Sequence, residues 1–291
     1  NEWESAVKNA KSDQSFDRFW KALFENTNSN LEYPVFEEGS VLATRKAFGA
    51  TLDKFAEQVP NIVGGSADLE PSNYTTNFAH KYGDFSKENK LGRNLAFGVR
   101  EFPMAAAMNG IALHGGLIPF GGTFLVFADY ERPALRLASI QKCGVIHEFT
   151  HDSFWVGEDG PTHQPVEQAM SLRAIPGFNV FRPADAKETV ASFKLAMNNK
   201  TSPSALLLTR QGVPVLNQPI DEIIEGVGRG AYVVVEEDGP ELVFLATGSE
   251  VSLAMDVASN MTDKRVRVVS MPCWEIFEDQ PQSYKESVIP V

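Results

Sequence analysis

Short apolar runs alternate with longer segments of helical periodicity over residues 41–216. The apolar runs predict buried strands at 61–65, 95–98, 117–120, 145–149, 180–182 and 205–209. The helical spacing predicts helices between them at 44–58, 102–113, 124–141, 166–175 and 186–198. Strands that alternate with helices in this way predict an α/β fold, in which helices cover both faces of a parallel sheet.

The chain on either side of this region shows a different pattern. Residues 1–40 predict a helix and a linker, because Phe16, Phe19, Trp20, Leu23 and Phe24 recur at helical spacing before an interruption at 26–30. Residues 217–230 predict a linker with a turn. Strands at 231–236, 242–247 and 265–270, with a helix at 249–260, predict a second α/β domain. We therefore expect a helix and linker at 1–40, an α/β domain at 41–216 and a second domain at 217–291. The second domain is expected to be incomplete, since domains commonly have about 100–150 residues.

Composition narrows the class of protein and its partners. The chain has 291 residues, 43% hydrophobic and 22% charged, with a net charge of −12, which argues against binding to nucleic acid or anionic membranes. The longest uncharged run, 104–128, contains five glycines and fits a buried helix, turn and strand better than a membrane span. Cys143 and Cys273 follow no metal or redox spacing, so we expect a reduced, cytoplasmic setting.

The most polar stretch of the chain is HDSFWVGEDGPTHQP at 151–165, between a predicted strand and a predicted helix. Loops in this position lie beyond the carboxyl ends of strands, where open α/β sheets bind ligands. Two interpretations stay open: a polar small-molecule site, or a solvated surface loop. A metal site is a third interpretation, because His151, Asp152, Glu158, Asp159 and His163 have side chains of suitable types. Their spacing matches no metal motif, so we predict no metal ligands in this chain.

Other polar side chains follow predicted strands or open the domain. They are Ser66, Asp68 and Ser72, Arg100 and Glu101, Arg210, and Arg45. If the sheet is parallel, most of them meet the 151–165 loop at one edge, where arginines and a serine suit a phosphate or carboxylate.

Phe124, Phe127 and Tyr130 follow Gly121-Gly122 at spacings of three residues. On the helix predicted at 124–141 these rings share one face. Such a stripe is either core packing or an aromatic wall for a flat heterocycle.

These residues carry a resemblance to a known family. The chain resembles transketolases, the thiamine diphosphate enzymes of the pentose phosphate pathway, over about residues 40–291. The matching segments, in the family's order, include ATRK at 43–46, GGSADLEPSN at 64–73, FGVRE at 97–101, GGTF at 121–124, GEDGPTHQP at 157–165, RPAD at 182–185, TRQ at 209–211 and ATGSEV at 246–251.

The resemblance implies an organisation and an activity. Transketolases move a two-carbon ketol unit from a ketose phosphate to an aldose phosphate, with thiamine diphosphate and Mg²⁺. This chain resembles their pyrimidine-binding domain and part of the C-terminal domain. The diphosphate-binding domain, whose Gly-Asp-Gly motif holds Mg²⁺, has no counterpart in it. We therefore expect it to be a fragment or subunit that is inactive alone, forms a homodimer and acts with a diphosphate-binding domain or subunit.

The resemblance also assigns roles to residues near the cofactor. Glu101 matches the glutamate that hydrogen-bonds the pyrimidine ring of thiamine diphosphate and favours its imino tautomer. Phe124, Phe127 and Tyr130 match the aromatic pocket around that ring. Asp68 matches an acid close to the cofactor.

Further roles concern the sugar phosphate. Arg45, Ser72, His151 and Arg210 match the groups that hold it. Asp159 matches an acid that binds a substrate hydroxyl, and His163 a catalytic histidine close to the reacting carbons.

Two departures from the family pattern bear on substrate preference. Phe102-Pro103 stands where many members have histidine and alanine, and Phe154-Trp155 replaces smaller residues. The alternative to an enzyme part is a non-catalytic oligomerisation or binding module derived from the family. A degenerate module has no chemical need for the complete set Arg45, Glu101, His151, Asp159, His163 and Arg210, which favours the enzyme.

Overall fold

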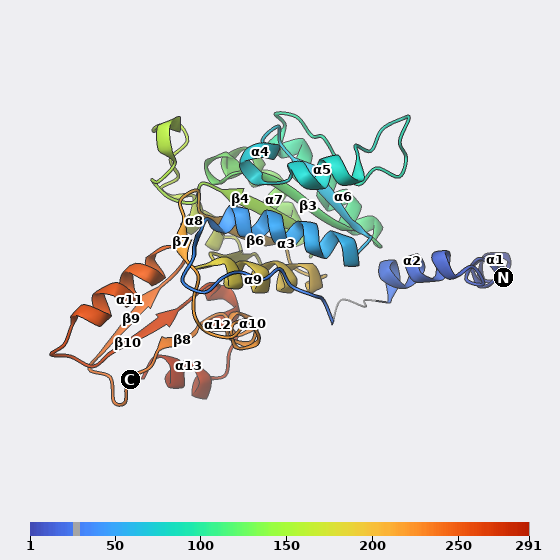
Figure 1. Cartoon of the computed structure of the whole chain (residues 1–291). Helices are drawn as coiled ribbons and strands as arrows, with labels where there is room; N and C mark the ends of the chain where they lie inside the picture. The colour runs from blue at the N-terminus through green and yellow to red at the C-terminus, as the bar shows by residue number, and fades with distance from the viewer. Residues whose placement is uncertain (26–29, 291) are drawn as a thin grey trace.

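Five parallel strands form the central sheet of the larger domain (Figure 1). Their order is β2-β3-β4-β6-β5, with β2 at Ile62–Ser66, β3 at Ile118–Phe124, β4 at Ile146–Thr150, β6 at Ser204–Leu208 and β5 at Asn179–Phe181. The structure is a computed structural model and describes residues 1–25 and 30–290. The predicted α/β fold with a parallel sheet is confirmed.

Helices cover both faces of this sheet, as predicted. α3 (Thr44–Gln58) and α9 (Ala186–Asn198) lie on one face, and α6 (Glu101–His114), α7 (Ala128–Ile140) and α8 (Gln168–Arg173) on the other. Successive side chains of β6 pack alternately against the helices on the two faces of the sheet, because neighbouring residues of a strand point to opposite faces. Leu206 and Leu208 belong to the cluster that contains Phe48 and Phe193, whereas Leu207 packs with Leu135 and Leu172.

The helices predicted at 44–58 and 186–198 begin and end where the sequence pattern places them. The start of α9 is fixed by Asp185, whose side chain accepts a hydrogen bond from the Glu188 backbone N–H over 2.8 Å. An N-cap of this kind satisfies an N–H group that the first turn of a helix leaves without a partner.

β3 is longer than the strand predicted at 117–120, and the helix predicted at 124–141 is correspondingly shorter. Gly121 and Gly122 lie inside the strand, and Phe124 is its last residue. A short 3₁₀ turn, η1 (Leu125–Phe127), then leads into α7. The glycines are required by close packing: a Cβ at Gly121 would lie 2.6 Å from the Met108 sulfur, and one at Gly122 would lie 2.4 Å from the Glu148 carboxylate.

Two further predictions of secondary structure are wrong. The strand predicted at 95–98 is absent: the Leu95 N–H donates to the Gly64 carbonyl, but Gly98 then takes a φ of +65° and ends the extended run. The linker predicted at 217–230 contains helix α10 (Ile220–Gly228). This helix is stabilised by the packing of Ile223 and Val227, which are fully buried in the main apolar cluster.

The C-terminal part forms a second, smaller α/β unit. Its sheet has the order β8-β10-β9, in which β10 (Val266–Ser270) is antiparallel to β8 (Tyr232–Val235) and parallel to β9 (Leu242–Ala246). α11 (Glu250–Asn260), α12 (Trp274–Glu278) and α13 (Gln282–Val288) accompany it. A two-stranded ribbon of β1 (Val41–Leu42) and β7 (Val213–Pro214) joins the two ends of the larger domain.

Smaller elements complete the description. α1 (Glu2–Ala10) and α2 (Gln14–Phe24) extend away from the larger domain (Figure 1), and α2 confirms the helix predicted there. Most of the interruption predicted at 26–30 lies outside the described residues. α4 (Glu70–Asn73) and α5 (Thr76–Tyr82) follow β2. Within residues 1–25 and 30–290, no helix has the length and hydrophobicity needed to cross a membrane.

Candidate ligand site at the carboxyl edge of the sheet

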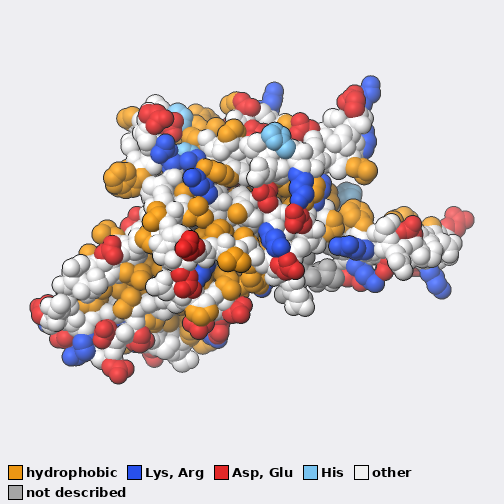
Figure 2. Space-filling model, viewed as in Figure 1, with side chains coloured by type: hydrophobic (Ala, Val, Ile, Leu, Met, Phe, Trp, Pro, Cys, Tyr) orange, Lys and Arg blue, Asp and Glu red, His pale blue; other side chains and the backbone are white. Residues whose placement is uncertain are grey.

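The sequence-predicted site residues come from segments that meet at one edge of the sheet. Arg210 follows β6, His151 follows β4 and Phe124 ends β3, so all three lie at carboxyl ends of parallel strands. The 151–165 loop projects from this edge, with the short 3₁₀ helix η2 (Gly157–Asp159) at its tip. Figure 2 shows Lys and Arg side chains gathered at the base of this projection, together with acidic and histidine side chains.

Two buried threonines bring Arg45 and Arg210 to the same place. The Thr44 N–H donates to Thr209 Oγ1 over 2.9 Å, and the Thr209 N–H donates to Thr44 Oγ1 over 2.7 Å. This reciprocal pair fixes the start of α3 against the end of β6. The next residue in each segment is an arginine, so the two cations are neighbours at the sheet edge.

Each arginine is oriented by further contacts. Arg45 donates from Nη1 to the Ser72 carbonyl over 2.9 Å, and its guanidinium carbon lies 5.2 Å from the centre of the Tyr74 ring. The pKa of Arg45 is lowered overall, mainly by burial. The nearby Tyr74 opposes this fall, and the positive charge of Arg210 adds to it. Arg210 packs against Gly157, where a Cβ would lie 2.8 Å from the guanidinium carbon, and its Nη2 lies 3.7 Å from Glu158 Oε2.

His151 is held in an unusual conformation beside these cations. Its φ is +59°, in the left-handed region, and the residue is 3% exposed. Nδ1 lies 2.9 Å from Thr150 Oγ1, and Nε2 lies 3.9 Å from Asp159 Oδ2. Burial, followed by the positive charges of Arg45 and Arg210, lowers the pKa of His151 to about 3. The imidazole is therefore neutral at pH 7 and offers one N–H donor and one acceptor nitrogen.

The predicted aromatic residues form a cluster, although not as one face of a helix. The Phe124 ring lies 3.8 Å from His151 and 5.9 Å from Phe127, measured between ring centres, and the Phe127 ring lies 6.0 Å from Tyr130. The strand end, the 3₁₀ turn and the helix start supply one ring each. Tyr130 is 64% exposed, so core packing does not account for the whole group. His163 meets the cluster at 5.3 Å from Phe127.

Two predicted residues lie at this edge without joining the group directly. Glu101 is the first residue of α6 and is partly exposed. Asp68 lies in the loop between β2 and α4, with a φ of +64°, and is exposed. Ser72 takes part through its backbone carbonyl, which accepts the bond from Arg45.

The structure adds an acid that the sequence analysis did not select. Glu148 is fully buried on β4, on the same strand face as Thr150. Burial raises its pKa well above the ordinary value, and the charge of Arg45 opposes the rise. The sequence signal that could have identified Glu148 is an acidic residue inside an otherwise apolar predicted strand, 145–149. The charge of Arg45 acts on this carboxyl, so Glu148 lies near the two arginines.

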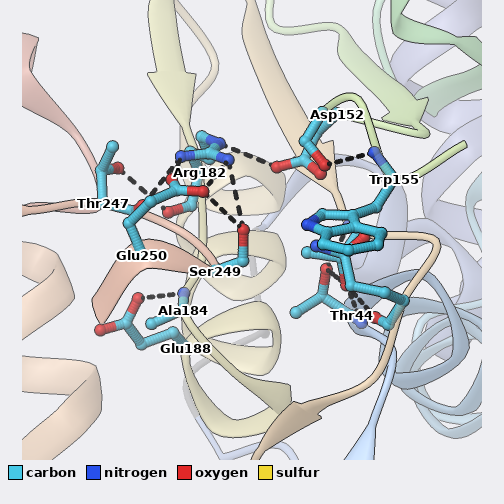
Figure 3. A network of polar contacts seen from close by, with 12 residues as sticks. Thr44, Asp152, Trp155, Arg182, Ala184, Glu188, Thr247, Ser249 and Glu250 are labelled. Atoms are coloured by element: carbon cyan, nitrogen blue, oxygen red, sulfur yellow. Dashed lines mark hydrogen bonds and ion pairs between the residues drawn. The ribbon is translucent and has the colours of Figure 1, made fainter. Parts of the chain in front are cut away.

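The candidate metal donors of the 151–165 loop do not come together in the described structure. Asp152 pairs with Arg182, whose Nε lies 2.8 Å from Asp152 Oδ2 (Figure 3). Across the described part of the chain, the structure contains no group of three or more His, Cys, Asp or Glu side chains placed to hold a metal ion.

The fold and this edge define an α/β domain of the class that binds a ligand at the carboxyl ends of its strands. Comparison with protein families gives a more specific result. Residues 40–215 match the model for "Transketolase, pyrimidine binding domain", and residues 230–291 match "Transketolase-like TK C-terminal domain". A transketolase of Halalkalibacterium halodurans is 52% identical over 260 residues, which cover 88% of this chain and 39% of that protein. The chain therefore belongs to the transketolase family.

Solved structures agree with this assignment. Transketolase from Leishmania mexicana is 43% identical, with a TM-score of 0.91 over 99% of this chain and 43% of that one. A complex of the Pichia stipitis transketolase with sedoheptulose 7-phosphate is 38% identical, with a TM-score of 0.89, over 99% of this chain and 44% of that one. A split-gene transketolase, described as an inactive β4 tetramer, is 30% identical, with a TM-score of 0.64 over 80% of this chain and 72% of that one. The chain spans 39–40% of the length of the curated relatives it matches.

Proposed function

We propose that this chain is the pyrimidine-binding portion of a transketolase, which moves a two-carbon ketol unit between sugar phosphates when a diphosphate-binding portion is present. The observation that supports this most directly is the meeting of Arg45, Arg210 and neutral His151 beside an aromatic cluster whose outer ring, Tyr130, is exposed. Two cations suit a phosphate, and the rings suit a flat heterocycle. The neutral histidine adds a directional hydrogen bond that reads a sugar hydroxyl or phosphate oxygen.

The residues present fit the pyrimidine end of thiamine diphosphate. Phe124, Phe127 and Tyr130 offer stacked and tilted rings, with Tyr130 exposed at the open side. Glu101 would hold the ring nitrogen and share a proton with it. When bound, the cofactor supplies the electron sink that ketol transfer requires. Its diphosphate and Mg²⁺ would be held by the diphosphate-binding portion, and Asp68 would lie near the cofactor.

Arg45 and Arg210 would bind the phosphate of the sugar, with Ser72 and His151 completing the contact. The Pichia stipitis enzyme, crystallised with sedoheptulose 7-phosphate, supports a sugar phosphate as ligand. Asp159, whose Oδ2 lies 3.9 Å from His151 Nε2, would accept a hydrogen bond from a sugar hydroxyl. His163 lies beside Phe127 and would donate or accept a proton near the reacting carbons. Buried Cys143 and Cys273 form no disulfide, which supports a cytoplasmic setting.

Arg210→Ala tests the phosphate assignment. In an assembly completed by the diphosphate-binding portion, we expect KM for phosphorylated sugars to rise by about 10- to 150-fold. This corresponds to the loss of a charge-assisted hydrogen bond of about 1.5–3 kcal/mol. Steady-state kinetics with phosphorylated and unphosphorylated sugars measures the effect, and unphosphorylated sugars should react almost as before.

Arg18→Ala is the matched control, because Arg18 is an exposed arginine on α2, outside the candidate site. It removes the same charge and should leave both kinds of sugar unaffected. Equal losses for phosphorylated and unphosphorylated sugars in Arg210→Ala would exclude a role confined to the phosphate.

The isolated chain should bind thiamine diphosphate weakly and show no ketol transfer, because this part of the family holds only the pyrimidine end. The split-gene relative, described as inactive when it forms a β4 tetramer, supports this expectation. Calorimetry with Mg²⁺ and thiamine diphosphate measures the binding. Adding the diphosphate-binding portion of a relative should restore activity. A chain that stays inactive under that condition would favour the alternative of a non-catalytic module.

We also expect the chain to self-associate as a homodimer. Large apolar side chains lie exposed on α6 and α7, among them Phe102, Leu113, Leu137 and Ile140, at 45–64% exposure. Exposed apolar surface commonly marks an interface when it is extensive. Sedimentation at micromolar concentration should show a dimer, and a species that remains a monomer at that concentration would contradict the proposal.

A further inference from the structure

A polar network links the carboxyl edge of the sheet to the C-terminal domain (Figure 3). Arg182, directly after β5, donates from Nε to Asp152 Oδ2 over 2.8 Å and from Nη1 to the Thr247 carbonyl over 2.8 Å. Its guanidinium also pairs with Glu250, and Nη2 lies 3.4 Å from Ser249 Oγ. One side chain therefore contacts both Asp152, the residue after His151, and a loop of the second domain.

The 247–250 loop is shaped around this arginine. Gly248 has a φ of +60°, and a Cβ at this position would lie 2.8 Å from Arg182 Cγ and Cζ. The Gly248 N–H donates to the Arg182 carbonyl over 3.0 Å. Any residue with a side chain at 248 would displace the guanidinium, so the conformation of the loop and the direction of Arg182 depend on each other.

The other end of the network reaches His151. Asp152 is the next residue, with a side chain that is 0% exposed. Its N–H donates to the Leu208 carbonyl over 3.2 Å, and its carboxylate accepts from Arg182. His151 itself has a φ of +59°, a conformation that persists in a residue with a side chain only where the surroundings hold it. The two anchors of Asp152 fix the chain directly after that unusual residue.

We propose that the 247–250 loop of the C-terminal domain positions His151, acting through Arg182 and Asp152. The Arg182 guanidinium is oriented by Glu250, Ser249 and the Thr247 carbonyl. The guanidinium in turn fixes the position of the Asp152 carboxylate. The C-terminal domain thereby controls a residue of the ligand site that it does not contain. The effect on sugar phosphate binding rests on the proposed function, whereas the positioning of His151 does not.

A second ion pair between the same two domains supplies the control. Arg173, on α8, donates from Nη1 to Glu275 Oε1 over 3.2 Å, and the Val180 N–H donates to Glu275 Oε2 over 3.1 Å. Glu275 belongs to α12 and has no contact with Asp152 among those described. Glu275→Gln therefore weakens the contact between the domains without releasing Arg182.

The test compares Glu250→Gln with Glu275→Gln in the full chain. Glu250 has a side chain that is 51% exposed, so its variant should fold. With histidine ¹³C-labelled at the ring Cε1 position, the five histidines give five signals at most, and His151→Asn assigns one of them. The His151 ring lies 3.8 Å from Phe124, so the ring current makes its signal sensitive to small displacements. We expect this signal to move in Glu250→Gln and to stay in place in Glu275→Gln.

Hydrogen exchange gives a second measurement of the same effect. Peptides covering 150–153 should exchange about tenfold faster in Glu250→Gln than in the unmodified chain, as in a local loss of stability. Gly248→Ala, which displaces Arg182 without changing any charge, should act in the same direction. An unchanged His151 signal and exchange rate in Glu250→Gln, or equal changes in Glu275→Gln, would overturn the proposal.

Kinetics in a completed assembly separates this proposal from the proposed function. KM for a phosphorylated sugar should rise about 3- to 10-fold in Glu250→Gln, with a smaller change in kcat, as expected for loss of binding rather than of a reacting group. If the His151 signal moves while KM does not, the positioning is established. In that case the role of His151 in binding the sugar phosphate is wrong.

Discussion

Glu101→Gln should reduce turnover by about 10²–10⁴-fold in an assembly completed by the diphosphate-binding portion, the usual scale for a positioned acid–base group. Glu101 is the first residue of α6, and its side chain is partly exposed. A carboxylate can accept and share a proton with the ring nitrogen. An amide of the same shape cannot hold that charge, so binding should survive while turnover falls.

Steady-state kinetics at saturating cofactor measures this effect. KM for the sugar phosphate should change little, because Arg45, His151 and Arg210 are untouched. Glu88→Gln is the control, since Glu88 is an exposed glutamate outside the site and should keep full turnover. Two results together would contradict the assignment of catalysis to Glu101 and phosphate binding to Arg210. They are near-normal turnover in Glu101→Gln and loss of activity towards unphosphorylated sugars in Arg210→Ala.

Glu188→Gln should remove the part of the pH dependence of stability that comes from this one carboxyl. Glu188 is fully buried between the two domains and accepts hydrogen bonds from Tyr232, Ser270 and the Ala184 N–H at 2.6–2.8 Å. Burial, together with the charge of Asp185, nevertheless raises the pKa of its carboxyl to about 7. The folded protein therefore keeps a proton on Glu188 at pH values where the unfolded chain has lost it.

The direction of the effect follows from this difference. A carboxyl whose pKa is raised by folding contributes stability that is fully present below its unfolded pKa, near 4.5, and is lost as the pH rises through about 7. Between pH 5 and pH 8 the unmodified chain should lose about 2–3 kcal/mol of unfolding free energy through this group alone, at 1.36 kcal/mol per pKa unit. The Gln variant has no such group to titrate.

Urea denaturation at several pH values between 5 and 8 measures the difference between the two chains. The stability advantage of the unmodified chain should shrink steadily over this range. Glu225→Gln is the control, because Glu225 forms only an exposed ion pair with Arg229 on α10, and its curve should run parallel to that of the unmodified chain. If the curves for Glu188→Gln and the unmodified chain are parallel as well, Glu188 does not titrate as described.

Local sequence patterns were sufficient for the long amphipathic helices. α3 and α9 begin and end as predicted, because their apolar spacing is clear and α9 has an aspartate N-cap. β3 was predicted too short, since Gly121-Gly122 resembles a turn when its partners are unknown. Only the structure shows that Met104 and Met108 pack directly on Gly121, and this contact comes from a helix earlier in the chain.

The residues of the candidate site could be predicted from the sequence, but the way they lie relative to one another could not. Arg45, Arg210, His151 and Phe124 were selected from strand ends and from the resemblance to transketolases. Their approach to one another depends on long-range contacts that no local pattern encodes. The same holds for Glu148, whose burial follows from the position of β4 in the middle of the sheet.

The reciprocal hydrogen bonds between Thr44 and Thr209 have a consequence for the order of folding. They join residues 165 positions apart, so the intervening chain loses conformational freedom before the bonds can form. Contacts between residues so far apart in sequence generally slow folding, because the chain loses the entropy of loop closure before the contacts can stabilise the fold. Arg45 and Arg210 are thus separated in every partly folded form that lacks this closure. A nascent or locally opened chain holds at most one of the two cations in position, and only the completed domain presents them together.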